Sequence, residues 1–380
     1  SSLKFSLFDR AGDALALAQS GLIDNLPGAA HFVARDAGGA MLAARDFAPG
    51  ALAAHDGAIE FLLDYLGAAA GAAALAAVGH RVVHGGTRFI APVRVTPSII
   101  DELARLAPLA PLHQPHNLAP IRIFARLAPA LPQVACFDTA FHATAPAIAQ
   151  AFALPRALSD AGIRRYGFHG LSYEFIAERL RAVDGAAAAG RVVVAHLGNG
   201  ASMCAMVDGR SVATTMGLTA LDGLVMGTRT GAIDPGVLLY LMRERAMDER
   251  ALDDLLYKRS GLLGVSGVSS DMRALLASDD PHAAFAIELF CYRAVREIGS
   301  LAAAMGGIDA LVFTAGIGEH AAPVRERIVL ALGWLGFALD EASNARNALR
   351  ISPPHGKPAY AMPTDEELMI ARHTRGIIDA

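Results

Sequence analysis

The chain has 380 residues, which is enough for two domains with a large buried core. Hydrophobic residues make up 53% of it and charged residues 18%, a balance that excludes a disordered chain. The formal net charge of -4 provides no basic surface for nucleic acid, so a small anionic ligand would have to be bound by local arginines.

The cysteines and the apolar stretches favour a cytoplasmic protein. Cys136, Cys204 and Cys291 lie far apart and share no CxxC spacing, which argues against a disulfide scaffold or a zinc ribbon and for buried thiols. No signal peptide is evident at the start, the stretch 65–79 is too short to cross a bilayer, and the stretch 298–318 is interrupted by an aspartate and glycines. We expect a soluble protein without a membrane segment.

The first third of the chain predicts strands and helices in alternation. Residues 3–8 alternate large apolar with polar side chains, as one strand of a hairpin does, and we expect its partner strand to be absent. The further predicted elements are a helix over 55–66, a strand over 76–83, a helix over 98–106 with Ser98 as its N-cap, a helix over 117–127 and a buried strand over 133–137.

The centre of the chain changes character. Residues 191–215 predict three consecutive strands, with Asp208-Gly209 as a two-residue hairpin turn. Helices are expected over 237–305, interrupted by a glycine- and serine-rich loop at 261–270. A strand at 311–314 and a helix at 322–332 follow.

Two glycine turns stand at the ends of apolar strands. The first is Gly198-Asn199-Gly200 and the second is Gly316-Ile317-Gly318. Glycine turns let backbone N–H groups approach an anion, because no Cβ blocks the way. One such turn is weak evidence, but two beside Arg, His and Asp residues indicate a nucleotide held between two lobes. We therefore predict an α/β protein with a cleft between similar halves, each carrying one turn.

Residues near the end of the strand 76–83 are candidates for binding an anion. Arg81 precedes two glycines at the strand end, although a solvated surface arginine is an equal alternative. His80 and His84 are too far apart along a strand to share one metal ion. His113 and His116 flank a proline that should prevent a helix there, so His113 is either a phosphate or carboxylate partner or a helix-entry residue.

Other polar residues occupy equally constrained positions. Asp138 ends a buried strand and is either an N-cap or a group directed at a metal or substrate. His169 lies between glycines, which makes an incidental histidine unlikely to be tolerated there. Arg229 also lies between glycines, with an ion pair to Asp222 or Asp234 as the alternative.

Near the C-terminus, three successive acids, Asp365, Glu366 and Glu367, predict a helix start capped by Thr364. One acid could still hold Mg²⁺. Together with the arginines, the histidines and the glycine turns, these groups match the requirements of phosphoryl transfer. Neither a Walker loop nor a G-x-S-x-G elbow is present in the sequence.

At this point the sequence resembles the acetokinase family, the acetate kinases within the acetate and sugar kinase/heat-shock/actin superfamily. The matching segments, in family order over nearly the whole chain, are SSLKF, GHRVVHGG, PLAPLHQPHNL, ACFDTAFH, RRYGFHG, HLGNGAS, MGLTALDGLVMGTRTGAIDPG, DMR, FTAGIGEH and PTDEEL. The resemblance implies two duplicated ribonuclease-H-like (actin-like ATPase) domains, a homodimer, and Mg²⁺-dependent transfer of a phosphoryl group between ATP and acetate. It implies an N-terminal lobe of residues 1–141 plus 368–380, and a nucleotide-binding lobe of residues 142–367.

The resemblance also implies roles for individual residues. Arg81 and Arg229 would bind acetate and the transferring phosphoryl group, His169 would stabilise that group, and Asp138 would lie near acetate and metal. Glu366 would be the ligand of Mg²⁺, with Mn²⁺ as an alternative metal. The implied acyl-binding residues are Arg81, Val83, Leu112, Phe168 and Ala220. The implied nucleotide- and phosphate-site residues are His113, His169, His196, Gly198, Asn199, Gly200, Asp271, Met272, Arg273, Gly316, Ile317, Gly318 and His320.

The chain departs from the family pattern in three places. The family has a strand and an Asn-Ala-Gly-Ser turn immediately before SSLKF, and a trimmed or disordered N-terminus is the explanation we favour. Ala220 stands where proline is usual beside the acyl pocket, so we expect some tolerance of propionate. His320 and Ala232 stand where Asn and Asp are common. The alternatives that remain are a propionate kinase, which shares nearly every motif, an actin-like ATPase and an inactive binding protein.

Overall fold

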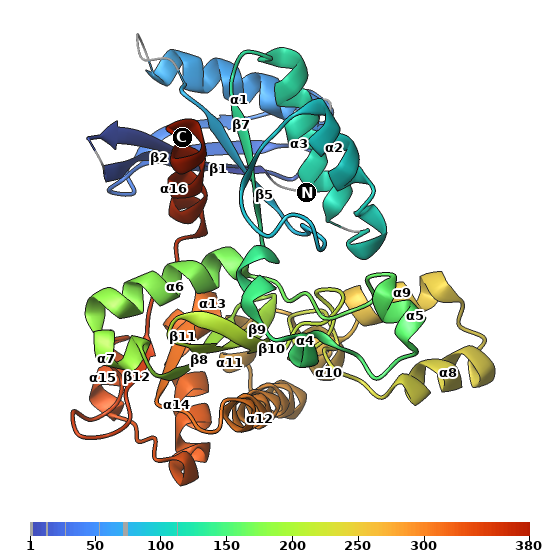
Figure 1. Cartoon of the computed structure of the whole chain (residues 1–380), viewed down its shortest axis with the longest axis vertical. Coiled ribbons are helices and arrows are strands. Elements are labelled where there is room, and N and C mark those ends of the chain that lie inside the picture. Colours follow the sequence, from blue (N-terminus) through green and yellow to red (C-terminus); the bar gives the residue numbers. More distant parts are fainter. Residues whose placement is uncertain (1–2, 13, 27, 53, 71–74, 112) are drawn as a thin grey trace. The chain divides into compact units, whose positions relative to one another are not determined.

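The computed structural model describes residues 3–12, 14–26, 28–52, 54–70, 75–111 and 113–380. Contacts divide the chain into two compact units (Figure 1). Unit 1 comprises residues 1–140 and 365–380, and unit 2 comprises residues 141–364. This division differs from the expected lobes by one residue at the first boundary and by three at the second, so that Glu366 belongs to unit 1.

The described residues of unit 1 form two sheets. The first has the order β1-β2-β3-β4 and the second the order β5-β7-β6. Its strands are β1 (Leu3–Ala11), β2 (Ala14–Asp24), β3 (His31–Asp36), β4 (Met41–Asp46), β5 (Val78–Val82), β6 (Val93–Arg94) and β7 (Gln133–Phe137). Its helices are α1 (Ala54–Ala70), α2 (Pro97–Ala104), the 3₁₀ turn η1 (Ala107–Leu109), α3 (Gln114–Leu127) and α16 (Glu366–Ile378), while η2 (Ala140–Thr144) spans the boundary.

The first sheet of unit 1 packs its apolar face on α1. Phe5, Ile23 and Phe32 are buried there with Leu62 and Leu66 of this helix. The expectation that strand 3–8 has no partner is wrong, because β1 pairs antiparallel with β2, which follows it in the sequence. A strand partner can come from either side in sequence, and the alternation of apolar residues does not say which.

The second sheet of unit 1 positions candidate site residues. β5 and β7 run parallel, with Arg81 opposite Cys136 and Val82 opposite Phe137. The sequence predicted β7 as a buried strand, and all five of its residues are buried. α16, the last helix of the chain, packs on β5 and β7. The carboxyl ends of two parallel strands therefore lie at one edge of this sheet, beside the start of a helix.

Two predicted helix starts in unit 1 are wrong in detail for the same reason. α2 begins at Pro97, and its N-cap is Thr96, whose hydroxyl accepts a hydrogen bond from Ile99 N–H, rather than Ser98. α3 begins at Gln114 with Pro115 in its first turn. Proline is tolerated in the first turn, where its missing N–H would have no intrahelical partner. Pro115 therefore starts the helix that it was expected to prevent.

Unit 2 is built on one five-stranded sheet with the order β10-β9-β8-β11-β12. Its strands are β8 (Arg191–Leu197), β9 (Ala201–Val207), β10 (Arg210–Thr214), β11 (Ala310–Thr314) and β12 (Ala359–Ala361). β8, β9 and β10 form the predicted antiparallel meander, whereas β11 runs parallel to both β8 and β12. The Asp208-Gly209 turn is confirmed, with positive φ of 50° and 70° at its two residues, as a type I′ hairpin turn requires.

Helices lie on both sides of this sheet. In Figure 1, α6 lies on one side and α12 and α14 on the other. The helices of unit 2 are α4 (Ala147–Gln150), α5 (Arg156–Asp160), α6 (Gly170–Val183), α7 (Gly185–Ala188), α8 (Pro235–Glu244), α9 (Glu249–Lys258), α10 (Gly261–Ser266), α11 (Met272–Leu276), α12 (Pro281–Ala304), α13 (Ala315–His320), α14 (Ala322–Ala331), the 3₁₀ turn η3 (Gly333–Leu335) and α15 (Glu341–Ala345).

Three expectations about unit 2 need correction. Residues 261–266 form α10 within the stretch that was expected to be a loop. Gly316-Ile317-Gly318 is part of the short helix α13 rather than an open turn. Both glycine turns also lie in unit 2, not one in each half. The two turns follow β8 and β11, parallel neighbours in one sheet, so their strand ends meet at the same edge.

Candidate active site

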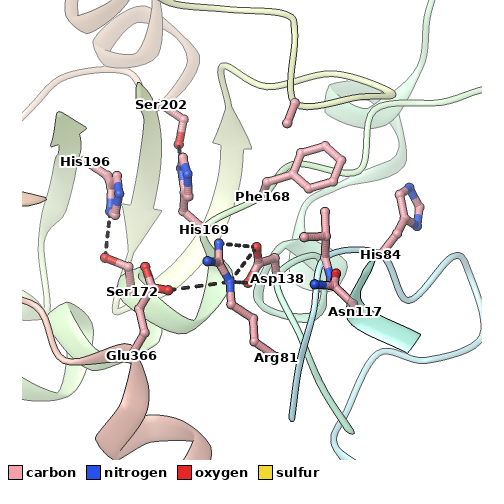
Figure 2. Close-up of polar contacts among 12 residues, drawn as sticks. Arg81, His84, Asn117, Asp138, Phe168, His169, Ser172, His196, Ser202 and Glu366 are labelled. Carbon is pink, nitrogen blue, oxygen red and sulfur yellow. Dashed lines mark hydrogen bonds and ion pairs between the residues drawn. The ribbon is translucent and has the colours of Figure 1, made fainter. Parts of the chain in front are cut away.

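Arg81, Asp138 and Glu366 lie together in unit 1 (Figure 2). Because Asp138 directly follows β7, its carboxylate reaches the side chain of Arg81 on the neighbouring strand β5. Arg81 Nε donates to Asp138 Oδ1 at 2.9 Å and Nη2 donates to Oδ2 at 2.7 Å. Such a two-point contact fixes the guanidinium plane. The nearby carboxylate of Asp138 raises the pKa of Arg81 against the opposing effect of burial, and Glu366 adds to the rise.

The three acids at the start of α16 have different environments. Asp365 is the N-cap, accepting a hydrogen bond from Leu368 N–H at 2.9 Å, so the expectation that Thr364 caps this helix is wrong. Glu367 pairs with Lys4. Glu366 turns toward the cluster, with its Oε2 3.6 Å from Arg81 Nε. Consecutive helical residues point in different directions, which separates the capping acid from the one at the site.

The other candidates of unit 1 surround the end of β5. Val83 donates its N–H to Asn117 Oδ1 at 2.9 Å, which ties this strand end to α3. His113 occupies the N-cap position of α3. Leu112 lies outside the described residues. His84 is buried, and its Nδ1 accepts from Gly86 N–H, whereas His80 contacts Gln133, so the two histidines have separate partners.

In unit 2 the first glycine turn brings Arg229 and His169 together. A Cβ added to Gly200 would lie 2.9 Å from Arg229 Nη2 and 3.6 Å from His169 Nε2. Only glycine leaves that space open, so Gly200 provides a cradle into which a cation and an imidazole both reach. The residues present fit a phosphate group, since a guanidinium, an imidazole and backbone N–H groups are the usual donors to phosphoryl oxygens.

Arg229 is positioned by a neutral partner. Its Nη1 donates to the carbonyl oxygen of Ala220 at 2.7 Å. The two ion pairs considered from the sequence are wrong, because Asp222 pairs with Arg165 at 3.0 Å and Asp234 caps α8. Burial lowers the pKa of Arg229. In the described part of the chain no carboxylate pairs with this guanidinium, so its charge is available to an anion.

His169 and His196 of unit 2 form a stacked pair. The rings of His169 and His196 lie 4.1 Å apart with an interplanar angle of 13°. His169 Nδ1 lies 2.8 Å from Ser202 Oγ, and His196 Nδ1 lies 2.9 Å from Ser172 Oγ (Figure 2). Phe168, just before His169, is buried, and its carbonyl oxygen contacts His142 Nε2 at 2.9 Å.

The candidate adenosine residues lie in α11 and α13. Asp271 caps α11 and pairs with Arg273, whose Nη2 lies 2.6 Å from Asp271 Oδ2, while Met272 is buried. Gly316, Ile317 and Gly318 form the first turns of α13. His320 ends that helix with 73% of its side chain exposed.

Sequence reasoning missed the serines that hold the histidines. Ser202 faces His196 in the β8–β9 register, and Ser172 lies one helical turn after His169. The spacing of Ser172 was visible in the sequence. The link from Ser202 to His169 was not, because it joins the hairpin to a separate helix.

The donors suit magnesium more than a soft metal. Asp138 and Glu366 supply hard oxygen ligands, and Mg²⁺ commonly uses one or two carboxylates together with substrate phosphates. Among the residues that the structure describes, no group of three or more His, Cys, Asp or Glu could hold a metal alone.

None of the described helices is long and apolar enough to span a membrane.

The strand order of unit 2, and an arginine and a histidine that both reach a glycine turn, are typical of a phosphotransferase of the actin-like class. The model of the acetokinase family matches residues 1–372, and the chain belongs to this family. It is 56% identical to an acetate kinase of Rhodopseudomonas palustris, over 100% of this chain and 96% of that protein.

Solved structures agree on the fold. A propionate kinase from Francisella tularensis is 37% identical, with a TM-score of 0.93 over 99% of this chain and 97% of that one. An acetate kinase from Porphyromonas gingivalis is 36% identical, with a TM-score of 0.89 over 100% and 97% of the two chains. The expected fold class is thereby confirmed, namely α/β with two ribonuclease-H-like, actin-like domains. The cleft between them stays a prediction.

Proposed function

We propose that the protein is an acetate kinase that transfers the terminal phosphoryl group of ATP to acetate, reversibly, giving acetyl phosphate and ADP. The observation that carries the proposal is the meeting of Arg229 and His169 at Gly200. The relatives named acetate kinase support the choice of acceptor.

The chemistry asks mainly for positioning and charge stabilisation. Acetate is ionised at neutral pH, so its oxygen can attack phosphorus in line without a general base. Charge spreads over the three equatorial oxygens of the phosphoryl group, where Arg229 and His169 would donate hydrogen bonds. Asp138 accepts from Nε and from one N–H of Nη2 of Arg81, so a substrate contact by Arg81 falls to Nη1 or to the second N–H of Nη2. Asp138 then orients Arg81 rather than removing a proton.

For the nucleotide we propose the roles carried over from the family resemblance, and all of these residues except His113 lie in unit 2. Asn199, which is exposed, and Gly200 would contact the phosphates. The remaining proposed contacts are with His113, His196, Gly198, Asp271, Met272, Arg273, Gly316, Ile317, Gly318 and His320. Asp138 and Glu366 would hold Mg²⁺, or Mn²⁺ in its place. When bound, the metal supplies positive charge that neutralises the phosphate oxygens.

A propionate kinase is the second candidate. It is favoured by the likeness to the Francisella propionate kinase and by Ala220, which stands where the family usually has proline. The residues that the family resemblance implies for binding the acyl group are Val83, Leu112, Phe168 and Ala220. One methylene contributes only about 1–3 kcal/mol of discrimination. We predict that Ala220→Pro lowers the propionate-to-acetate ratio of kcat/KM. An unchanged ratio would contradict a contact between Ala220 and the acyl group.

A hydroxamate assay for the acyl phosphate tests the function. Wild-type protein with ATP, Mg²⁺ and acetate, propionate or butyrate should form acyl phosphate in strict dependence on the acid. A rate of ATP hydrolysis that is the same with and without an added carboxylic acid would instead indicate an actin-like ATPase. Formation of no acyl phosphate and no ADP would indicate a binding protein.

We also propose a cytoplasmic homodimer. All three cysteines are buried, as suits a reducing compartment. α8 has no buried residue, and Leu239, Tyr240 and Met242 are about half exposed on it, which supports a partner surface filled by a second copy of the chain. Sedimentation of wild-type protein and of Tyr240→Glu tests this, with a monomeric variant expected; a wild-type monomer at micromolar concentration refutes it.

A further inference from the structure

The two stacked histidines of unit 2 are held crosswise. α6 begins just after His169 and carries Ser172, while the β8–β9 hairpin carries His196 and, opposite it, Ser202. The helix histidine contacts the hairpin serine, and the hairpin histidine contacts the helix serine. Each ring is therefore held through Nδ1 by the element that does not carry it.

Ser202 has a second hydrogen-bond partner besides His169. The phenol oxygen of Tyr173 lies 2.5 Å from Ser202 Oγ, and both side chains are completely buried. Tyr173 also packs its ring near Phe141, 6.3 Å between centroids, and near His142, 5.5 Å between centroids. The phenol is thereby fixed in place beside Ser202.

We infer that Ser202 is a positioning residue, which holds His169 in the tautomer that carries its proton on Nε2. A phenol is the more acidic hydroxyl, so Tyr173 donates to Ser202 Oγ. Ser202 then donates its own proton to Nδ1 of His169, and the proton of the neutral imidazole resides on Nε2. The second nitrogen of a histidine is commonly set by the partner of the first.

The backbone of His169 agrees with this role. Its φ of 59° and ψ of 25° lie in the left-handed region, which costs a residue with a side chain about 1–2 kcal/mol. Such a conformation persists where the surroundings fix it, and Ser202 supplies one of those contacts. Nε2 is the nitrogen that faces Gly200, 3.6 Å from the position of a Cβ there, and Arg229 Nη2 lies 2.9 Å from the same position. The tautomer thus makes His169 a neutral donor at the point where a phosphoryl oxygen would lie, an inference that rests on the proposed function.

The ring of His169 is also held by stacking on His196, with a centroid distance of 4.1 Å. Arg229 supplies the positive charge at this point, and His169 supplies a hydrogen bond of fixed direction.

The test combines nitrogen NMR with kinetics. Protein labelled with ¹⁵N in its histidine rings, with His169 assigned through His169→Gln, should show His169 protonated on Nε2. Ser202→Ala should convert it to a mixture of tautomers and lower kcat by about 10- to 100-fold, with KM for ATP within about threefold. Ser202→Thr, which keeps the hydroxyl, should restore both the spectrum and kcat.

Two further variants separate the parts of the argument. Tyr173→Phe keeps the buried ring and removes its hydroxyl, and it should also shift His169 toward the mixture. Ser172→Ala is the matched control: it removes the equivalent bond to His196 and should leave the His169 tautomer unchanged. An unshifted His169 spectrum in Ser202→Ala, or a wild-type ring protonated on Nδ1, overturns the inference. Wild-type protein that makes no acyl phosphate but shows these spectra would refute the proposed function and leave the role of Ser202 standing.

Discussion

Replacing Gly227 with alanine should displace Asn199 without altering it chemically. A Cβ at Gly227 would lie 1.8 Å from Asn199 Oδ1, below the 3.0 Å that such contacts require, so this oxygen must move by at least about 1.2 Å. Gly227 does not adopt positive φ, and its N–H bond to the carbonyl oxygen of Asn199, 2.9 Å, can remain. A misplacement of about 1 Å at a site can lower the rate by about 100-fold, which corresponds to about 2.7 kcal/mol.

The expected result is a fall of about 100-fold in kcat/KM for ATP, measured by acyl phosphate formation, with little change in stability because Asn199 is exposed. Gly299→Ala is the control, since its Cβ meets only Trp334 at 3.8 Å. Asn199→Ala combined with Gly227→Ala should be hardly worse than Asn199→Ala alone, because both act on one group. A Gly227→Ala enzyme within threefold of wild type, with an unchanged melting temperature, would refute the proposed phosphate contact of Asn199.

Three more predictions follow from individual contacts. Arg229→Ala should lower kcat by at least about 100-fold while KM for ATP changes little, and near-normal turnover would contradict the assigned role. Arg325→Leu should lower the free energy of unfolding by at least about 3 kcal/mol in urea melts. Arg325→Lys should lower it by less. This fully buried arginine makes five hydrogen bonds, two of them to the carbonyl oxygens of Gly318 and Glu319, and its loss leaves buried acceptors unpaired. Burial lowers the pKa of His142 to about 4 from 6.5. The unfolded chain therefore binds a proton before the folded one does, and stability should fall from pH 6.5 to pH 4. In His142→Gln the slope of the free energy of unfolding against pH should be smaller by up to about 1.4 kcal/mol per pH unit. Equal slopes for variant and wild type, measured by urea melts across that range, would refute the prediction.

Local chemistry decided which parts of the fold could be predicted. Asp208-Gly209 is a hairpin turn because two residues with positive φ are needed, and the sequence offers them there. Thr96 and Ser98 are both good caps, and Pro97 between them selects Thr96, since proline occupies the first helical position. The partner of β1 could not be predicted, because strand pairing depends on contacts beyond the strand itself.

The candidate site was predicted as a set of residues more readily than as a set of contacts. Strand ends and glycines marked Arg81, Asp138, His169 and Arg229 as constrained positions. Which groups touch which follows from tertiary packing: the parallel register of β5 and β7 brings Arg81 to Asp138, as no local spacing could indicate. Ser202 was missed for the same reason, since an ordinary serine within a buried strand has no distinguishing pattern.

The two arginines have different electrostatic surroundings, and this argues for different duties. Arg81 lies beside two carboxylates, Asp138 and Glu366, so one positive and two negative charges leave that cluster negative and suited to a cation. Arg229 bonds to a neutral carbonyl, so its cluster stays positive and suited to an anion. If this is right, replacing Asp138 with Asn should raise the Mg²⁺ concentration needed for half-maximal rate. Replacing Arg229 with Lys, which keeps the charge but not the planar fork, should leave that concentration unchanged while lowering kcat. An equal change in the Mg²⁺ concentration for half-maximal rate in both variants would contradict the assignment of the cation to the Arg81 cluster and of the anion to the Arg229 cluster.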